Sequence, residues 1–376
     1  MRTACLIGNG VSIAYNPALT VPNLTTELIQ RLQQLAGGDA ETALSGFAHQ
    51  IAAIPGEQFE ALLGPLTSSA AALEHIVDLA PLAAFAPEQA VVDGVTTTAD
   101  FLRQVHRLGL GTVLGSIAGH ATGKGDAFHT VTEALADALI ALGPAGSMTL
   151  ATLNYDGLTH AGLMEMGQDM WGQANFLIAD LASGQAATAQ QVLPGTTLAG
   201  HWLRDFDDIP TDRAALLHLH GYLGWLRQPE TGQVAKFTLD GLRDCDYWQQ
   251  FAAGACEWEP VVVLTDRKDR ATLEWPISLA YQTFLTRLVA AERWLIAGYG
   301  LGDAPVNNLY RTAVRSRARS GLGPARVLYV GLGPDDPDAV ASQARQALGL
   351  PSNPSVSMAG VPVAFASQEW DGFAAP

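Results

Sequence analysis

Three polar side chains that are common in catalysis stand directly after short apolar runs of the sequence. Asn154 and Asp156 follow the run 148–153, and His220 follows the run 215–219. Histidine has the proton affinity that suits base catalysis near neutral pH, and an asparagine at a strand end can hold a water or a hydroxyl group. Asp156 fits two interpretations equally well, a catalytic carboxylate or the N-cap of a helix expected at 158–166.

Metal ligation is the alternative use of these histidines. His218 and His220 are spaced as i and i+2, which places two side chains on the same side of a strand. The sequence offers no third ligand close to this pair. No Cys-x-x-Cys motif is formed by the three cysteines, which are Cys5, Cys245 and Cys256. We therefore expect chemistry without a metal, with His220 as the base and Gly221 leaving room beside it for a ligand.

Two glycine-rich turns also follow apolar runs. Residues 8–12 read Gly-Asn-Gly-Val-Ser, and residues 298–303 read Gly-Tyr-Gly-Leu-Gly-Asp. A strand, a Gly-x-Gly turn and a helix can offer backbone N–H groups to a diphosphate, although such a turn can need glycine for its geometry alone. Asp303 or Asn307 could bind ribose hydroxyls. The expected ligand contacts are Gly8, Asn9, Gly10, Ser12, Thr152, Gly298, Gly300, Asp303 and Asn307.

A standard nicotinamide dehydrogenase fits this pattern poorly. The ordinary dinucleotide fingerprint has a third glycine and an acidic residue about 20 positions on, after a second strand. Here a long helical region follows residues 8–12 instead.

Strands and helices alternate along most of the chain. Strands are expected at 3–7, 148–153, 215–219, 260–264, 294–297 and 326–330, and helices at 24–35, 158–166 and 273–288. This alternation predicts an α/β fold, a Rossmann-like and mostly parallel sheet with helices on both faces. Ligands bind beyond the carboxyl ends of such strands, which is where the polar tips and glycine turns fall.

The chain is expected to be a single domain, 1–376. Residues 1–19 and 147–376 form the predicted Rossmann-like core, and residues 20–146 form an inserted helical lobe without strands. Residues 167–213 are rich in Gly, Thr and Asp and are expected to be an irregular, mobile flap.

Composition narrows the function classes. The net charge is −16, which disfavours direct nucleic-acid binding. Arginines gather only at 311–319, where they are expected on the solvent face of a helix. Apolar residues make up 48% and charged residues 15%, so a folded core is expected. The sequence shows no signal peptide and no membrane span, and three scattered cysteines suit a cytoplasmic protein.

Taken in order, these elements resemble the sirtuin family, and in particular its bacterial sirtuin-like branch. Sirtuins open with a Gly-Ala-Gly-x-Ser turn, which is similar to residues 8–12 here. Their Thr-x-Asn-x-Asp motif matches Thr152, Asn154 and Asp156, and their catalytic His-Gly matches His220. Their last glycine-rich turn, which contacts the adenosine ribose, is similar to residues 298–303. Residues 6–13 and 59–63 look like the bacterial branch, which includes NAD-depleting effectors of antiphage defence.

The resemblance covers residues 1–16 and roughly 147–335. Two differences from the sirtuin pattern affect the function that it implies. Deacetylating sirtuins carry a four-cysteine zinc module that this chain cannot build, and Asn9 replaces the usual alanine. The resemblance then implies an NAD glycohydrolase that releases nicotinamide and ADP-ribose. Asn154 would orient the ribose or the water, and His220 would accept a proton. The alternatives are a sensor that binds NAD or ADP-ribose without turnover, and a protein deacylase or ADP-ribosyltransferase.

An enzyme that destroys NAD must be kept inactive in a healthy cell, and the chain shows no separate sensor domain. We therefore expect control by self-association or by a partner, such as an ATPase, a translocase or a nuclease subunit. The Ala- and Leu-rich helices between 20 and 146 offer apolar faces for a homo-oligomer, although an ordinary helical cap on the sheet explains them as well.

Overall fold

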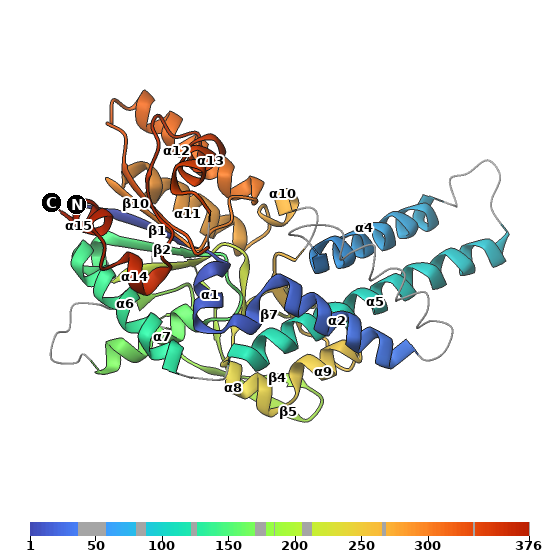
Figure 1. Ribbon diagram of the computed structural model, residues 1–376. Helices are drawn as coiled ribbons and strands as arrows, with labels where there is room; N and C mark the ends of the chain where they lie inside the picture. Colours follow the sequence, from blue (N-terminus) through green and yellow to red (C-terminus); the bar gives the residue numbers. More distant parts are fainter. Residues whose placement is uncertain are drawn as a thin grey trace.

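A parallel sheet forms the centre of the protein (Figure 1). The computed structural model describes residues 1–36, 58–79, 88–121, 126–169, 178–183, 185–204, 213–264, 268–333 and 335–375. In this part of the chain the sheet has seven strands in the order β12-β11-β10-β1-β2-β6-β3. Its strands are β1 (Thr3–Ile7), β2 (Met148–Thr152), β3 (Ile178–Ala179), β6 (Ala214–His218), β10 (Arg293–Ala297), β11 (Arg326–Val330) and β12 (Ser355–Ser357).

Burial on both faces explains why the sequence shows these strands as continuous apolar runs. Every residue of β1, β2, β6 and β10 is buried. Successive side chains enter two different cores, for example Cys5 and Ile7 on one face and Leu6 on the other. The predicted Rossmann-like sheet is confirmed, and the structure adds β12, which the sequence analysis did not identify.

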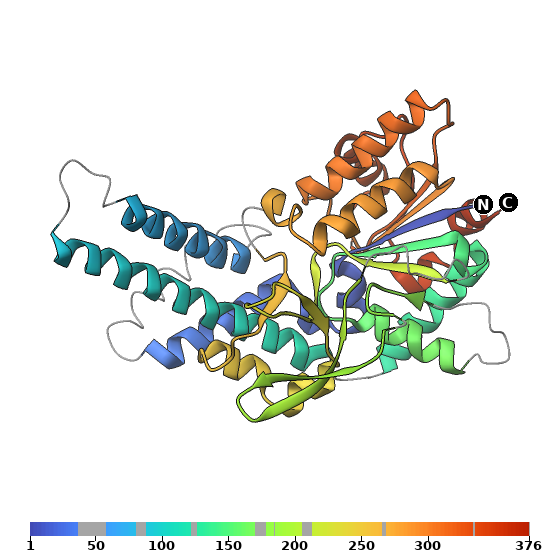
Figure 2. The same cartoon turned by 180° about the vertical axis from the view of Figure 1, so that it is seen from behind.

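Helices cover both faces of the sheet, as expected (Figures 1 and 2). One face carries α11 (Ile277–Ala290), α12 (Ala304–Arg319) and α13 (Pro337–Leu348). Asp336 caps α13 and Gly349 ends it in the left-handed region, the usual start and stop signals of a helix. The other face carries α1 (Asn9–Tyr15), α6 (Asp126–Leu142), α7 (Leu158–Asp169), α14 (Val361–Ala364) and α15 (Gln368–Ala374), with the short helices η1 (Pro17–Leu19) and η3 (Ala145–Ser147).

The predicted helical insertion is helical wherever it is described. It contains α2 (Val21–Ala36), α4 (Gln58–Leu79) and α5 (Gln89–Ala121). α4 and α5 lie against each other and extend away from the sheet as an arm (Figures 1 and 2). α6, the last helix of this segment, instead packs on the sheet through side chains such as Phe128 and Leu139. None of the described helices combines the length and apolar character needed to cross a membrane.

A second, antiparallel sheet corrects two predictions. Its order is β4-β5-β8-β7-β9, with β4 (Thr188–Leu193), β5 (Thr196–Trp202), β7 (Gly221–Arg227), β8 (Val234–Lys236) and β9 (Glu259–Val262). The expected flap at 167–213 therefore contains a hairpin as well as β3, and its residues 170–177, 184 and 205–212 lie outside the described residues. The strand expected at 260–264 pairs with β7 rather than joining the parallel sheet.

The remaining helices precede and follow β9 in the chain. They are α8 (Leu239–Asp244), α9 (Tyr247–Ala252) and α10 (Lys268–Ala271). One of them, α9, packs against α5.

One arginine departs from the predicted solvent-facing cluster. Arg317 is 6% exposed, and its guanidinium donates to the carbonyl oxygens of Val289, Ala291 and Gly323. It joins α12 to the end of α11, while Arg311, Arg315 and Arg319 are exposed. Arg317 is therefore a structural residue, because buried carbonyls need donors.

Candidate functional site

The strand order places the two glycine turns side by side. From β1 the chain continues to β2 on one side, whereas β10 and β11 lie on the other side. The order therefore reverses between β1 and β10, and ligands of open α/β sheets bind at such a switch point. Residues 8–12 and 298–303 follow these two strands, so both predicted turns meet there.

Close contact between the turns explains their glycines. A Cβ atom on Gly8 would lie 2.5 Å from the carbonyl oxygen of Gly298, and Gly298 itself has φ +66°. The N–H of Gly8 donates to the carbonyl of Ala297 at 2.8 Å, and that of Gly10 donates to the carbonyl of Gly298 at 2.9 Å. These two N–H groups hold the turns together. The close contact between the two turns is enough to explain their glycines. Contact of this turn with a diphosphate therefore stays a prediction.

A matched pair of glycine substitutions tests this interpretation. We expect Gly8→Ala to lower the free energy of unfolding by about 1–3 kcal/mol, the usual cost of overpacking. Gly300→Ala should change it by less than about 0.5 kcal/mol, because nothing lies within 4 Å of a Cβ atom there. Urea denaturation of both variants measures the difference, and equal stabilities would contradict the packing role of Gly8.

Asn154 lies two residues beyond the end of β2. Its side chain is 5% exposed, and its Nδ2 donates to the carbonyl oxygen of Gly8 at 3.1 Å. Its backbone N–H donates to Oγ1 of Thr152 at 3.0 Å. Thr152, which was predicted to contact a ligand, therefore fixes the backbone of Asn154. Its Oδ1 is buried and has no hydrogen-bond partner among the described residues. Asn154 is thus fixed by one end of its amide and keeps an acceptor for a ligand or a water.

His220 and Asp303 form a buried pair that the sequence did not reveal. Nε2 of His220 lies 3.1 Å from Oδ2 of Asp303, and both side chains are less than a tenth exposed. Oδ1 of Asp303 accepts the N–H of Val306, which makes Asp303 the N-cap of α12. Burial raises the pKa of Asp303, but the contacts with His220, the N–H of Val306 and Lys268 together outweigh burial and lower this pKa to about 2. Asp303 is therefore a carboxylate at neutral pH, held against His220.

Two further groups lie beside this pair. Nζ of Lys268, in α10, is 3.6 Å from Oδ2 of Asp303. The ring of Tyr155 is stacked on that of His220 with centroids 6.3 Å apart, and its hydroxyl donates to the carbonyl of Val263. Lys268 stands in a charged turn, and no sequence pattern marks it as a site residue. Tyr155 lies inside the Asn-Tyr-Asp motif but was not predicted to be a site residue.

Asp156 is buried just before α7 and contacts both this helix and the turn at 8–12. It is 4% exposed, its Oδ1 accepts the N–H of Leu158 at 2.8 Å, and its Oδ2 accepts the hydroxyl of Ser12. Burial raises the pKa of Asp156, and these hydrogen bonds oppose the shift. The contacts join the turn at 8–12 to the start of α7. Asp156 and Ser12 therefore position the site, and a catalytic role for Asp156 remains a prediction.

The other predicted ligand contacts have structural partners. Asn307 donates to the carbonyl of Leu301 at 2.8 Å and accepts the hydroxyl of Tyr299 at 2.8 Å. These two hydrogen bonds stabilise the second glycine-rich turn. Asn9 donates to the carbonyl of Leu19 at 3.3 Å. Their contact with a ligand, like that of Gly300, stays a prediction.

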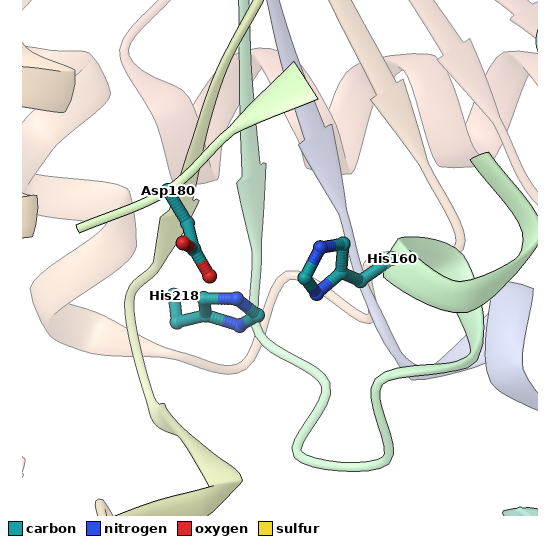
Figure 3. Close-up of side chains that lie close together, drawn as sticks. All are labelled: His160, Asp180 and His218. Atoms are coloured by element: carbon teal, nitrogen blue, oxygen red, sulfur yellow. The ribbon is translucent and has the colours of Figure 1, made fainter. Parts of the chain in front are cut away.

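The two histidines of the His-x-His pair contact different groups. His220 meets Asp303 and Tyr155, whereas His218 lies with His160 and Asp180 (Figure 3). The expectation that His218 lacks a third potential ligand was wrong, because His160 and Asp180 are distant in sequence but close in the fold.

Comparison with known proteins gives a weak structural likeness. No protein-family model matches the chain, and no curated protein matches its sequence. A solved structure of Sir2Tm bound to a propionylated peptide is similar over 99% of this chain and 94% of its own, with 10% identity and a TM-score of 0.42. A second, concerned with the mechanism and regulation of Sir2 enzymes, covers 99% of this chain and 90% of its own, with 10% identity and a TM-score of 0.35.

Proposed function

We propose that this protein binds NAD at the switch point and hydrolyses it to nicotinamide and ADP-ribose. The observation that carries the proposal is the placement of Asn154, His220 and Asp303 beyond the carboxyl ends of β2, β6 and β10. An amide with a spare acceptor and a histidine beside a buried carboxylate can orient a ribose or a water and accept its proton. The sirtuin-like order of the sequence motifs supports the same substrate.

The reaction follows from what each side chain offers. Nicotinamide is a good neutral leaving group, so the bond to ribose breaks through an oxocarbenium-like state. Oδ1 of Asn154 would accept a hydrogen bond from the ribose or from the attacking water. His220 would take the proton from that water or from a ribose hydroxyl, with Asp303 beside its ring. Base catalysis of this kind supplies about 10²–10⁴-fold, and positioning of the substrate supplies the rest.

No metal ion takes part in the proposed reaction. The proton transfers are assigned to His220, and the leaving group departs without a Lewis acid. We further propose that the activity serves to deplete NAD, as in the effectors of antiphage defence that the sequence motifs resemble.

Two other functions compete with hydrolysis. A sensor of NAD or ADP-ribose needs the turns but not a histidine held by a buried carboxylate. A deacylase transfers the ADP-ribosyl group to an acyl-lysine peptide. Incubation of the purified chain with NAD, with and without an acetyl-lysine peptide, separates the three. Peptide-independent ADP-ribose formation supports hydrolysis, while binding without turnover supports a sensor and peptide-dependent NAD consumption supports a deacylase.

We expect NAD cleavage to depend on assembly through the α4–α5 arm. The arm exposes large apolar side chains, among them Phe101 at 61% and Ile76 at 57%. Exposed apolar surface of this kind favours self-association or a partner subunit. Phe101→Glu should lower both the mass in solution and the turnover per chain. Val363→Glu, on α14 away from the arm, is the control, because Val363 is similarly exposed at 60%.

Light scattering and NAD turnover measured over a range of protein concentrations test this dependence. A monomer whose full activity is independent of concentration and of any partner would contradict it.

A further inference from the structure

A buried cluster outside the proposed NAD site has the composition of a metal centre. His160 lies on α7, Asp180 follows β3, and His218 ends β6. Their potential ligand atoms all lie within 4.8 Å of one another, and Figure 3 shows the three side chains facing a common point. Asp180 and His218 are 2% and 1% exposed. The proposed hydrolysis of NAD uses none of the three.

The cluster already holds one positively charged group, the ammonium of Lys236 on β8. Nζ of Lys236 lies 2.5 Å from Oδ2 of Asp180 and 3.3 Å from Nδ1 of His160. The same carboxylate oxygen and ring nitrogen could bind a metal ion. Oδ1 of Asp180 accepts the N–H of Ala182 and the hydroxyl of Ser183, and these contacts fix the carboxylate. A second layer of hydrogen bonds is typical of metal-binding carboxylates.

Lys236 leaves the third member of the cluster unsatisfied. Neither ring nitrogen of His218 has a hydrogen-bond partner among the described residues, although the side chain is almost fully buried. Its ring is packed against those of Tyr222 and Trp225, at centroid distances of 5.0 and 5.1 Å. An unpartnered buried polar group requires an explanation, because burial without a hydrogen bond is costly. A metal ion beside Asp180 would give one ring nitrogen its partner.

We propose that His160, Asp180 and His218 bind a divalent transition-metal ion such as Zn²⁺, and that Lys236 moves off Asp180 when the ion enters. Two imidazoles and one carboxylate suit zinc and its neighbours rather than calcium or magnesium, which prefer oxygen ligands. Three protein ligands leave a fourth position for water. A cavity of about 600 Å³, lined by His160, Asp180 and Lys236 among others, adjoins the cluster.

The ion would connect three elements that are distant in sequence. It would join the short edge strand β3, the strand β6 and the helix α7, and so anchor the segment that leads to the β4–β5 hairpin. The ion would lie apart from the chemistry at His220, which faces Asp303.

Calorimetric titration of the metal-free full chain with Zn²⁺ tests the proposal. We expect one ion per chain, and affinity at least about 10-fold lower in Asp180→Asn and in His160→Phe. His201→Gln is the matched control, because His201 lines the same cavity but bonds the carbonyl of Gln185 instead. Lys236→Met should bind Zn²⁺ more tightly than the wild type, since the competing ammonium is gone.

Lys236→Met keeps all three proposed ligands, and its expected result is a gain of affinity. A misfolded variant could imitate a loss of binding but not this gain. Titration with Co²⁺ adds the visible absorption of the bound ion, which should be lost in His160→Phe and kept in His201→Gln. Absence of Zn²⁺ binding by both the wild type and Lys236→Met would overturn the proposal. Binding that is unchanged by Asp180→Asn and His160→Phe would overturn it as well, because the ion would then lie elsewhere.

Discussion

Replacing His220 by alanine is expected to lower the rate of NAD cleavage by about 10²–10⁴-fold, the usual share of a general base. The ring is buried beside Asp303 and Tyr155, so its loss removes the proton acceptor without disturbing a strand. Asn154→Ala should be similarly inactive, because it removes the spare acceptor Oδ1 together with the contact to Gly8. Nicotinamide release, measured by chromatography under conditions in which the wild type is active, gives both rates.

His201→Gln is the control for these variants, since it alters a partly buried histidine outside the site. Far-ultraviolet circular dichroism should match the wild type for His220→Ala and its thermal unfolding should remain cooperative, while the midpoint falls because Asp303 loses its buried partner. Wild-type turnover in either His220→Ala or Asn154→Ala would remove that residue from the mechanism.

Substitution of Asp303 by asparagine separates its two roles. Asparagine still caps α12, because its Oδ1 can accept the N–H of Val306 in place of the carboxylate. It cannot supply the negative charge that lies 3.1 Å from Nε2 of His220. We therefore expect Asp303→Asn to keep the cap of α12 and lose much of the 10²–10⁴-fold that base catalysis provides.

Asp303→Ala is the companion variant. It loses both the cap and the charge, so its free energy of unfolding should fall by about 1 kcal/mol in addition to the loss of rate. Chemical denaturation and steady-state kinetics on the two variants give the comparison. Wild-type turnover in Asp303→Asn would reduce Asp303 to a helix cap.

The parallel sheet was predictable because its strands are buried on both faces and read as apolar runs. The second sheet was less so. β4 and β5 each begin with threonine, and burial varies irregularly along both strands, so the sequence resembled an irregular loop. β9 was recognised as a strand but assigned to the wrong sheet, because its partner β7 starts only three residues after β6 ends. β12 has three residues, too few for a pattern.

The sequence could predict which residues lie at the site but not which side chains they contact there. Strand-end position and motif order selected Asn154 and His220, and the structure places both beyond the carboxyl edge of the sheet. Contact of Asp303 with a ribose stays a prediction, and its contact with His220, from a strand three places away in the sheet, was not foreseen. The cluster of His160, Asp180 and His218 was missed for the same reason. Such contacts depend on the order of strands in space, which spacing along the chain does not encode.

Product analysis of NAD incubated with the purified full chain, at increasing protein concentration and without any peptide, decides whether this site hydrolyses NAD. Proton magnetic resonance distinguishes nicotinamide, ADP-ribose and intact NAD in one sample. We expect equal amounts of nicotinamide and ADP-ribose, formed by the wild type and not by His220→Ala. NAD that stays intact at every concentration while it binds the chain would contradict hydrolysis at this site.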